Sequence, residues 1–194
     1  AWKRLTTVAA VVERDPAMAA KVLQLVNSAY FGLAQRVTSV AQAMVYLGAD
    51  TMKGLVLTSQ VFALAEQRQL PGLSIDALQE HSLMTARLAK RLVVNQRVAD
   101  DAFTAGLLHD IGQIALSVSM PETYAEVLRA ARERPLQEAE QERLGVSHAE
   151  AGAYLLGVWG RPGSGSEAVA YNRRRRGVEA GDREVLAAVH VADT

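Results

Sequence analysis

The sequence contains no cysteine among its 194 residues. Disulfide bonds, thiolate metal sites and cysteine nucleophiles are therefore excluded as sources of stability or chemistry. Acidic and basic side chains are equal in number, 21 of each, so no overall electrostatic field attracts nucleic acid or an anionic membrane. We accordingly expect no direct DNA binding.

Long apolar runs are absent as well. No stretch approaches the roughly 18 to 20 apolar residues that a membrane-spanning helix needs, and no signal-peptide pattern is present. Apolar residues make up 49% and charged residues 22% of the chain, a composition typical of a soluble globular protein with a core. We expect a cytoplasmic protein. Because the chain starts at Ala1 and stops directly after an apolar segment, we also expect it to be a fragment of a longer polypeptide.

The periodicity of amphipathic helices runs through the whole sequence. Alanine and leucine are frequent, apolar residues recur at helical spacing, and no Asn-Gly or Asp-Gly hairpin signal separates alternating runs. Asp15 followed by Pro16 is typical of a helix start, and Gly32 is the expected end of that helix. Thr38 or Ser39 is expected to cap the next helix. The predicted fold class is all-α.

Pro71 and Gly72 give the strongest internal boundary signal. We therefore predict an N-terminal helical subdomain, residues 1–72, and a second helical block, residues 73–194, packed against each other. Helices of the second block are expected over 75–93, 99–119, 120–136 and 147–160 and at the C-terminus, with Asp100 or Asp101, Pro121, Ser147 and Asp182 near their starts.

Histidine and aspartate occur together in the second block in a pattern that suits a metal ion. The candidate ligands in chain order are His81, His109, Asp110, His148 and Asp193. Imidazole and carboxylate together favour a divalent Fe, Mn, Zn or Ni ion. Adjacent side chains on a helix point about 100° apart, so a site that uses both His109 and Asp110 needs partners from other helices. A bound ion would lower the pKa of a coordinated water and polarise a phosphoryl oxygen.

The same residues also have a plain structural interpretation. A single histidine on an apolar helix is more often a hydrogen-bonded core or edge residue than a ligand. Asp110 can simply hold His109 in one tautomer, as carboxylates beside histidines do. His148 follows Ser147 and can be a surface residue at a helix start, and His190 can be a packing residue. Spacing alone leaves both interpretations open.

Two further segments invite a binding hypothesis. Arg173, Arg174, Arg175 and Arg176 form the densest charge in the chain, and guanidinium groups bind phosphate through paired hydrogen bonds. A solvated loop is the alternative for this run. The stretch 27–31, Asn-Ser-Ala-Tyr-Phe, is interpreted as a turn at a helix end, with a ligand groove as the alternative.

Several segments together resemble the HDOD domain family, the metal-dependent hydrolase-related output domains of bacterial signalling proteins. They include Asn27-Ser28-Ala29, Leu47-Gly48 and the stretch GLLHDIG at 106–112, and the similarity runs nearly end to end. The resemblance implies an all-α fold whose second block is a degenerate HD-type bundle. It further implies the metal signature of the HD phosphohydrolase superfamily. That signature maps onto His81, His109, Asp110 and Asp193, with His148 at an additional position used by the cyclic-di-GMP phosphodiesterase branch.

The sequence departs from the catalytic relatives at several positions. Gln113 stands where the cyclic-di-GMP branch has a lysine, and a neutral amide cannot stabilise phosphate charge as a cation does. Tyr171 and Asn172 occupy the place of two consecutive histidines, and tyrosine is a poor ligand at neutral pH. No Gly-Tyr-Pro tripeptide occurs in the chain. A second metal ion therefore lacks ligands.

The resulting prediction is a non-catalytic output domain of bacterial signal transduction, with no certain cofactor and at most one divalent ion. We expect it to act downstream of a sensory or receiver domain, as in a two-component system. It would bind a signalling protein partner or a nucleotide second messenger. The alternative is a mononuclear metal-dependent phosphohydrolase that uses the same four ligands and holds substrate phosphate with the arginines of 173–176. The oligomeric state stays open.

Overall fold

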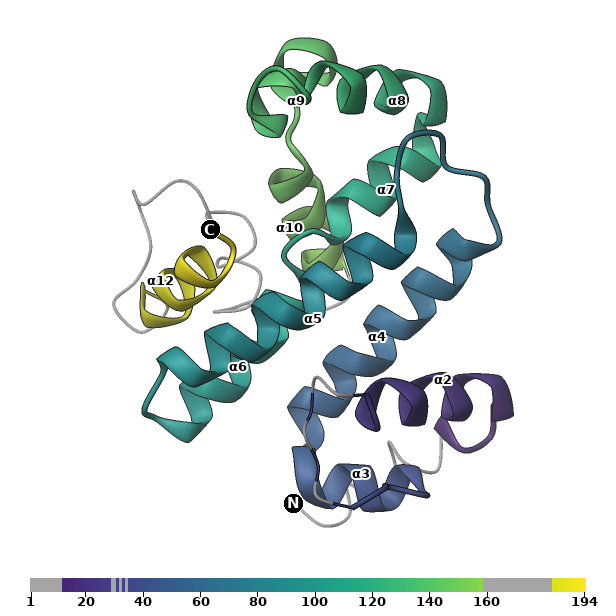
Figure 1. Cartoon of the computed structure of the whole chain (residues 1–194), viewed down its shortest axis with the longest axis vertical. Helices are drawn as coiled ribbons and strands as arrows, with labels where there is room; N and C mark the ends of the chain where they lie inside the picture. Colours follow the sequence, from purple (N-terminus) through teal and green to yellow (C-terminus); the bar gives the residue numbers. More distant parts are fainter. Residues whose placement is uncertain (1–11, 29–30, 32, 34, 159–182) are drawn as a thin grey trace. The chain divides into compact units, whose positions relative to one another are not determined.

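The computed structural model describes residues 12–28, 31, 33, 35–158 and 183–194. Every regular element in these ranges is a helix, which confirms the predicted all-α class (Figure 1). Within the same ranges no helix combines the length and the apolar character needed to cross a membrane. The chain forms two compact units, residues 1–60 and 61–194. Each unit is described by itself.

The first unit contains α2 (Pro16–Val26), α3 (Val40–Leu47) and the beginning of α4 (Ala49–Glu66). The Asp15 carboxylate accepts hydrogen bonds from two backbone N–H groups in the first turn of α2, and Pro16 occupies the first helical position. Ser39 caps α3 in the same way. Gly48 ends α3 with a φ of 79°, a conformation that favours glycine.

Helix α2 ends at Val26, so the expected end at Gly32 is wrong. The reason is the side chain of Asn27. Its amide nitrogen donates to the carbonyls of Leu23 and Val37, 2.8 Å each, and its oxygen accepts from the Val37 N–H at 2.7 Å. An asparagine that hydrogen-bonds backbone groups competes with helix continuation, and here it ties the helix end to the segment before α3.

The second unit begins inside α4. Phe62 and Ala65 of α4 pack with Leu78 and Ile114 in one apolar cluster, so this half of the helix shares the core of the second unit. Pro71 and Gly72, the expected boundary, lie in the turn between α4 and α5, whereas the two compact units divide between residues 60 and 61. The remaining helices are α5 (Ile75–Leu92), α6 (Gln96–Leu108), α7 (Ile111–Ser119), α8 (Pro121–Ala130), α9 (Leu136–Leu144), α10 (His148–Val158) and α12 (Arg183–Ala192).

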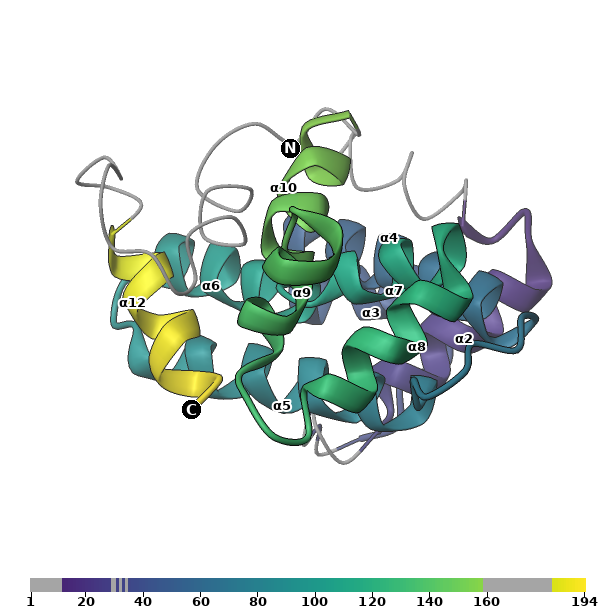
Figure 2. The same ribbon diagram turned by 90° about the horizontal axis from the view of Figure 1, so that it is seen from above.

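Two very close helix contacts shape this unit. Helices α5 and α6 lie side by side with α12 against both (Figures 1 and 2), and alanines dominate their shared cluster. A Cβ atom at Gly106 of α6 would lie 2.8 Å from the Cα of Ala86 in α5. A Cβ at Gly112 of α7 would fall onto the carbonyl group of His148 in α10. Glycine is therefore required at both contacts.

Several expected helix limits in this unit are wrong. Helix α6 begins at Gln96, so Asp100 does not cap it; instead its carboxylate pairs with Lys90 at 2.7 Å. The single helix expected over 99–119 is two helices with a break at 109–110. Helix α9 was not predicted. Asp182, the expected cap of α12, lies outside the described residues.

Other expected helix starts agree with the structure. Pro121 occupies the first turn of α8. Ser147 precedes α10 as expected: its hydroxyl accepts from the Glu150 N–H, and the Glu150 carboxylate accepts from the Ser147 N–H at 2.8 Å. This reciprocal pair is a capping box.

Candidate metal centre

The break between α6 and α7 places His109 and Asp110 in a turn rather than on a continuous helix. On an unbroken helix the two side chains would point about 100° apart. In the turn, His109 Nε2 lies 3.3 Å from Asp110 Oδ2, so the imidazole and the carboxylate face the same place. The expectation that both residues lie within one helix is wrong, and the break is what lets them share a site.

Two residues distant in sequence complete this cluster. His81 comes from the middle of α5, and Asp193 directly follows α12. Asp193 Oδ1 lies 3.0 Å from His81 Nε2 and 3.1 Å from His109 Nε2, and ligand atoms of these three residues all lie within 4.8 Å of one another. Asp110 Oδ2 is 3.9 Å from His81 Nε2. The structure thus brings together the four residues proposed as ligands of a mononuclear site.

The hydrogen bonding of His109 fits a metal ligand. Its Nδ1 lies 2.7 Å from the carbonyl oxygen of Gly106, one turn earlier in α6. Because a carbonyl can only accept, Nδ1 carries the proton and Nε2 is the nitrogen available to coordinate an ion. Metal-binding histidines almost always donate their other N–H in this way. Two imidazoles and two carboxylates form a donor set that suits a divalent first-row ion.

Without an ion, protonation of His109 offsets part of the negative charge of the two carboxylates. Burial disfavours the protonated form of His109, but the adjacent Asp110 carboxylate, together with Asp193, outweighs it and raises the pKa of His109 to about 10. Burial likewise disfavours the ionised form of Asp110, yet His109 and His148 lower its pKa to about 2. Metal ligands must be deprotonated, so a metal ion would displace the proton of His109.

The four side chains of the cluster differ strongly in exposure. The side chain of His109 is only 1% exposed, and those of Asp110 and Asp193 are 10% and 8% exposed, whereas His81 is 43% exposed. Of these four side chains, His81 is therefore the one most accessible to solvent.

His148 lies beside the cluster. It is the first residue of α10, but it is buried, so its interpretation as a surface residue is wrong. Its Nε2 is 3.4 Å from Asp110 Oδ1, the carboxylate oxygen opposite the one that faces His109. Its Nδ1 is 2.7 Å from Glu140 of α9. Neither Glu140 nor its partner Tyr124 was among the predicted residues.

Part of the sequence prediction cannot be compared with the structure. Arg173, Arg174, Arg175 and Arg176, like Tyr171 and Asn172, lie outside the described residues. Gln113, the neutral residue in place of a lysine, is buried in α7 one turn after Asp110.

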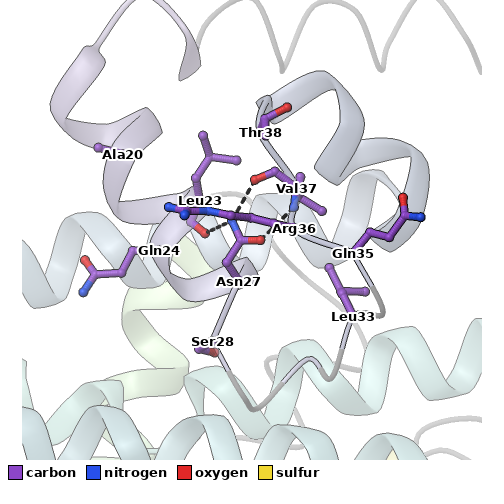
Figure 3. A pocket seen from close by; sticks show the side chains of 10 residues that line it. All are labelled: Ala20, Leu23, Gln24, Asn27, Ser28, Leu33, Gln35, Arg36, Val37 and Thr38. Atoms are coloured by element: carbon purple, nitrogen blue, oxygen red, sulfur yellow. Dashed lines mark hydrogen bonds between the residues drawn. The ribbon is translucent and has the colours of Figure 1, made fainter.

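A pocket in the first unit lies where the sequence left a ligand groove open as an alternative. It encloses about 950 Å³ between the end of α2 and the start of α3 (Figure 3). Its lining residues are Ala20, Leu23, Gln24, Asn27, Ser28, Leu33, Gln35, Arg36, Val37 and Thr38. The Asn27 side chain is occupied by backbone groups, so its role is to hold the two walls together.

Comparison with known proteins agrees with this architecture. The family model of the HDOD domain matches residues 3–174. The chain belongs to the HDOD domain family. A solved HDOD domain protein of unknown function from Geobacter sulfurreducens is 27% identical, with a TM-score of 0.79 over 97% of this chain and 64% of that one. The response regulator MmoQ from Methylococcus capsulatus is 26% identical, with a TM-score of 0.53 over 97% of this chain and 78% of that one.

The chain spans only part of the length of these relatives. An uncharacterised protein of Treponema pallidum is 26% identical over an alignment of 166 positions, and the match covers 82% of this chain and 31% of that protein. The chain also spans less than two thirds of the Geobacter protein.

Proposed function

We propose that this HDOD domain is the output module of a signalling protein and that it holds one divalent metal ion between His81, His109, Asp110 and Asp193. The observation that carries the proposal is the convergence of His81, His109 and Asp193, whose ligand atoms lie within 4.8 Å of one another. The Gly106 carbonyl supports it, because it keeps His109 in the tautomer that coordinates through Nε2.

The origin of the ligands favours a binding role for the ion. They come from α5, from the turn between α6 and α7, and from the residue after α12, which are elements packed against one another. An ion bound between these ligands would fix the arrangement of the helices and therefore the surface available to a partner. MmoQ, which shares the fold, is a response regulator. The partner is proposed to be another signalling protein, with a nucleotide second messenger as the alternative.

Elemental analysis tests the metal site directly. The purified protein is expected to contain about one equivalent of Fe, Mn, Zn or Ni, or to take one up after chelation and dialysis against each ion. Asp193→Asn keeps the shape of the side chain but removes its charge, and it is expected to lose the ion. Asp76→Asn, an exposed aspartate in the first turn of α5, is the matched control and should retain it. A wild-type protein that takes up none of these ions would rule out the site.

A mononuclear phosphohydrolase is the second candidate function, favoured by the solvent exposure of His81. A divalent ion bound there supplies Lewis acidity toward a phosphoryl oxygen. In that case His81 would border the path of the phosphate ester, and Asp110 and Asp193 would hold their carboxylates in the buried part of the site.

Assays with synthetic phosphate esters separate the two functions. The metal-loaded protein is tested with a phosphomonoester and a phosphodiester in the presence of Mn, Fe, Co or Ni. Turnover that disappears in His109→Ala and with chelator would establish the hydrolase. Stoichiometric metal with no turnover of either ester supports the output domain. Affinity capture of partners with the full-length polypeptide, with and without chelator, then tests whether binding depends on the ion.

A further inference from the structure

Glu140 is fully buried, although it belongs to α9, a helix whose other side chains are mostly polar. Its carboxylate meets three hydrogen-bonding groups. The Tyr124 hydroxyl donates to Oε1 at 2.7 Å, the backbone N–H of His148 donates to Oε2 at 3.0 Å, and His148 Nδ1 lies 2.7 Å from Oε2. A buried carboxylate is tolerated only when it is paired in this way. The site is therefore built for this group.

This arrangement determines which nitrogen of His148 carries a proton. A backbone N–H can only donate, so Oε2 of Glu140 is an acceptor. An acceptor oxygen 2.7 Å from Nδ1 requires the proton on Nδ1. Glu140 thus keeps Nδ1 protonated and turns Nε2 toward the metal centre.

The other end of the imidazole reaches Asp110. His148 Nε2 lies 3.4 Å from Asp110 Oδ1, while Oδ2 of the same carboxylate lies 3.3 Å from His109 Nε2. The backbone carbonyl of His148 is packed directly against Gly112 of α7, which keeps the start of α10 close to the turn that carries Asp110. The orientation of His148 therefore limits the orientation of the Asp110 carboxylate.

We propose that Glu140 is a positioning residue of the metal centre, which holds the His148 ring through its Nδ1–H group so that Nε2 faces and positions the Asp110 carboxylate, and that Tyr124 in turn holds Glu140. The half of this inference that concerns the ion rests on the proposed metal site. The half that concerns His148 does not, because every contact that carries it is present in the protein without an ion. Glu140 contacts none of the four proposed ligands in the interactions described, so its influence passes through His148.

The nitrogen resonances of histidine measure the His148 part directly. The chain has only four histidines, so long-range proton–nitrogen NMR spectra of protein labelled with ¹⁵N-histidine can be assigned by single substitutions. Metal-free wild-type protein is expected to show His148 protonated at Nδ1. An unprotonated Nδ1 in the folded wild type would overturn the inference, whatever any variant does.

Glu140→Gln and Glu140→Leu separate the charge of Glu140 from its role as a hydrogen-bond acceptor. The glutamine amide group can donate to the Tyr124 hydroxyl, which is able to accept, so Glu140→Gln removes the charge but leaves an acceptor for Nδ1 of His148. Glu140→Leu removes the acceptor as well, and in it His148 is expected to lose the Nδ1 proton and to keep the proton on Nε2, which Asp110 Oδ1 can accept. Glu138→Gln, an exposed position in the same helix, is the matched control and should leave His148 unchanged. Tyr124→Phe keeps the carboxylate and should preserve the Nδ1 proton.

Metal affinity provides the second measurement. Glu140→Gln is expected to bind the ion about tenfold more weakly than wild type, a loss typical of partners behind metal ligands. Glu138→Gln should bind it equally well. A Nδ1 proton that persists in Glu140→Leu, together with unchanged metal affinity in Glu140→Gln, would overturn the inference. If the wild type takes up no ion, the proposed metal site fails, and the NMR comparison alone decides the role of Glu140.

Discussion

His109 donates its Nδ1 proton to the carbonyl oxygen of Gly106 over 2.7 Å, and this single contact links a packing residue to the chemistry of the cluster. Gly106 allows α6 to lie directly against α5, and its carbonyl sets the tautomer of the histidine one turn later. Gly106 therefore both allows the close packing of α5 and α6 and fixes the tautomer of His109.

Gly106→Ala is therefore expected to disturb both functions of this residue. The new Cβ would lie 2.8 Å from the Cα of Ala86, so the two backbones must separate, at a cost of about 1–3 kcal/mol in the free energy of unfolding. Urea denaturation measures this loss. Gly157→Ala in α10 is the control, because nothing lies within 4 Å of its Cβ; it should instead stabilise the helix by up to about 1 kcal/mol. Equal stabilities of the two variants would contradict the packing argument.

Removal of the metal ion should lower the stability of the wild-type protein. A ligand that binds only the folded state contributes about 2.7 kcal/mol when its free concentration is 100 times its Kd. Thermal unfolding of the loaded protein with and without chelator is the measurement. In Asp193→Asn the chelator should change nothing, since that variant lacks the ligand. A chelator effect of the same size in both proteins would place the ion elsewhere.

The metal-free protein should lose stability as the pH rises from about 6.5 to about 10. The pKa of His109 is raised from 6.5 to about 10, so its stabilising contribution is complete below the unfolded value and disappears as the pH passes the folded one. Asp110, with its pKa lowered from 3.8 to about 2, contributes above 3.8 and loses its contribution as the pH falls toward 2. Urea unfolding of chelated protein across this range measures both slopes.

His109→Asn serves as the comparison for this experiment. The variant lacks the titrating imidazole, so its free energy of unfolding should change less between about pH 6.5 and about 10 than that of the wild type. An alkaline slope as steep in the variant as in the wild type would assign the effect to another group.

Tyr124→Phe should destabilise the fold by about 1.5–3 kcal/mol. Its hydroxyl is buried and donates to the Glu140 carboxylate at 2.7 Å, and hydrogen bonds to charged groups contribute about this much. Tyr154→Phe removes a hydroxyl from a side chain that is 74% exposed, and it should change stability by no more than about 0.5 kcal/mol. Chemical denaturation of both variants tests the difference, and a similar small effect in both would contradict the role given to Glu140.

The sequence predicted local structure well where one side chain decides it. Asp15 and Ser39 begin their helices as expected, because a cap needs only the neighbouring backbone N–H groups. The end of α2 was missed because Asn27 finds its partner at Val37, ten residues away. The break at His109-Asp110 was missed because both flanking segments are apolar and helical in pattern, and only tertiary packing separates them.

The candidate site was predictable to a similar degree. His81, His109, Asp110 and Asp193 came from residue types and from the family resemblance, and the structure places them together. That they bind an ion stays a prediction. Nothing in the sequence distinguished Glu140 as a site residue, because it lies in an acidic, polar stretch like those of many exposed helices. Only the burial of its side chain against Tyr124 and His148 distinguishes it from its neighbours.

The difference in exposure between His81 and His109 allows the metal occupancy of the site to be measured by chemical modification. Diethyl pyrocarbonate acylates accessible imidazoles, and in this cluster His81 presents 43% of its side-chain surface while His109 presents 1%. Coordination would occupy the nucleophilic nitrogen of His81 and slow its carbethoxylation. Mass-spectrometric footprinting of one peptide could then report metal occupancy in a crude extract, before any purification step has had the opportunity to strip the ion.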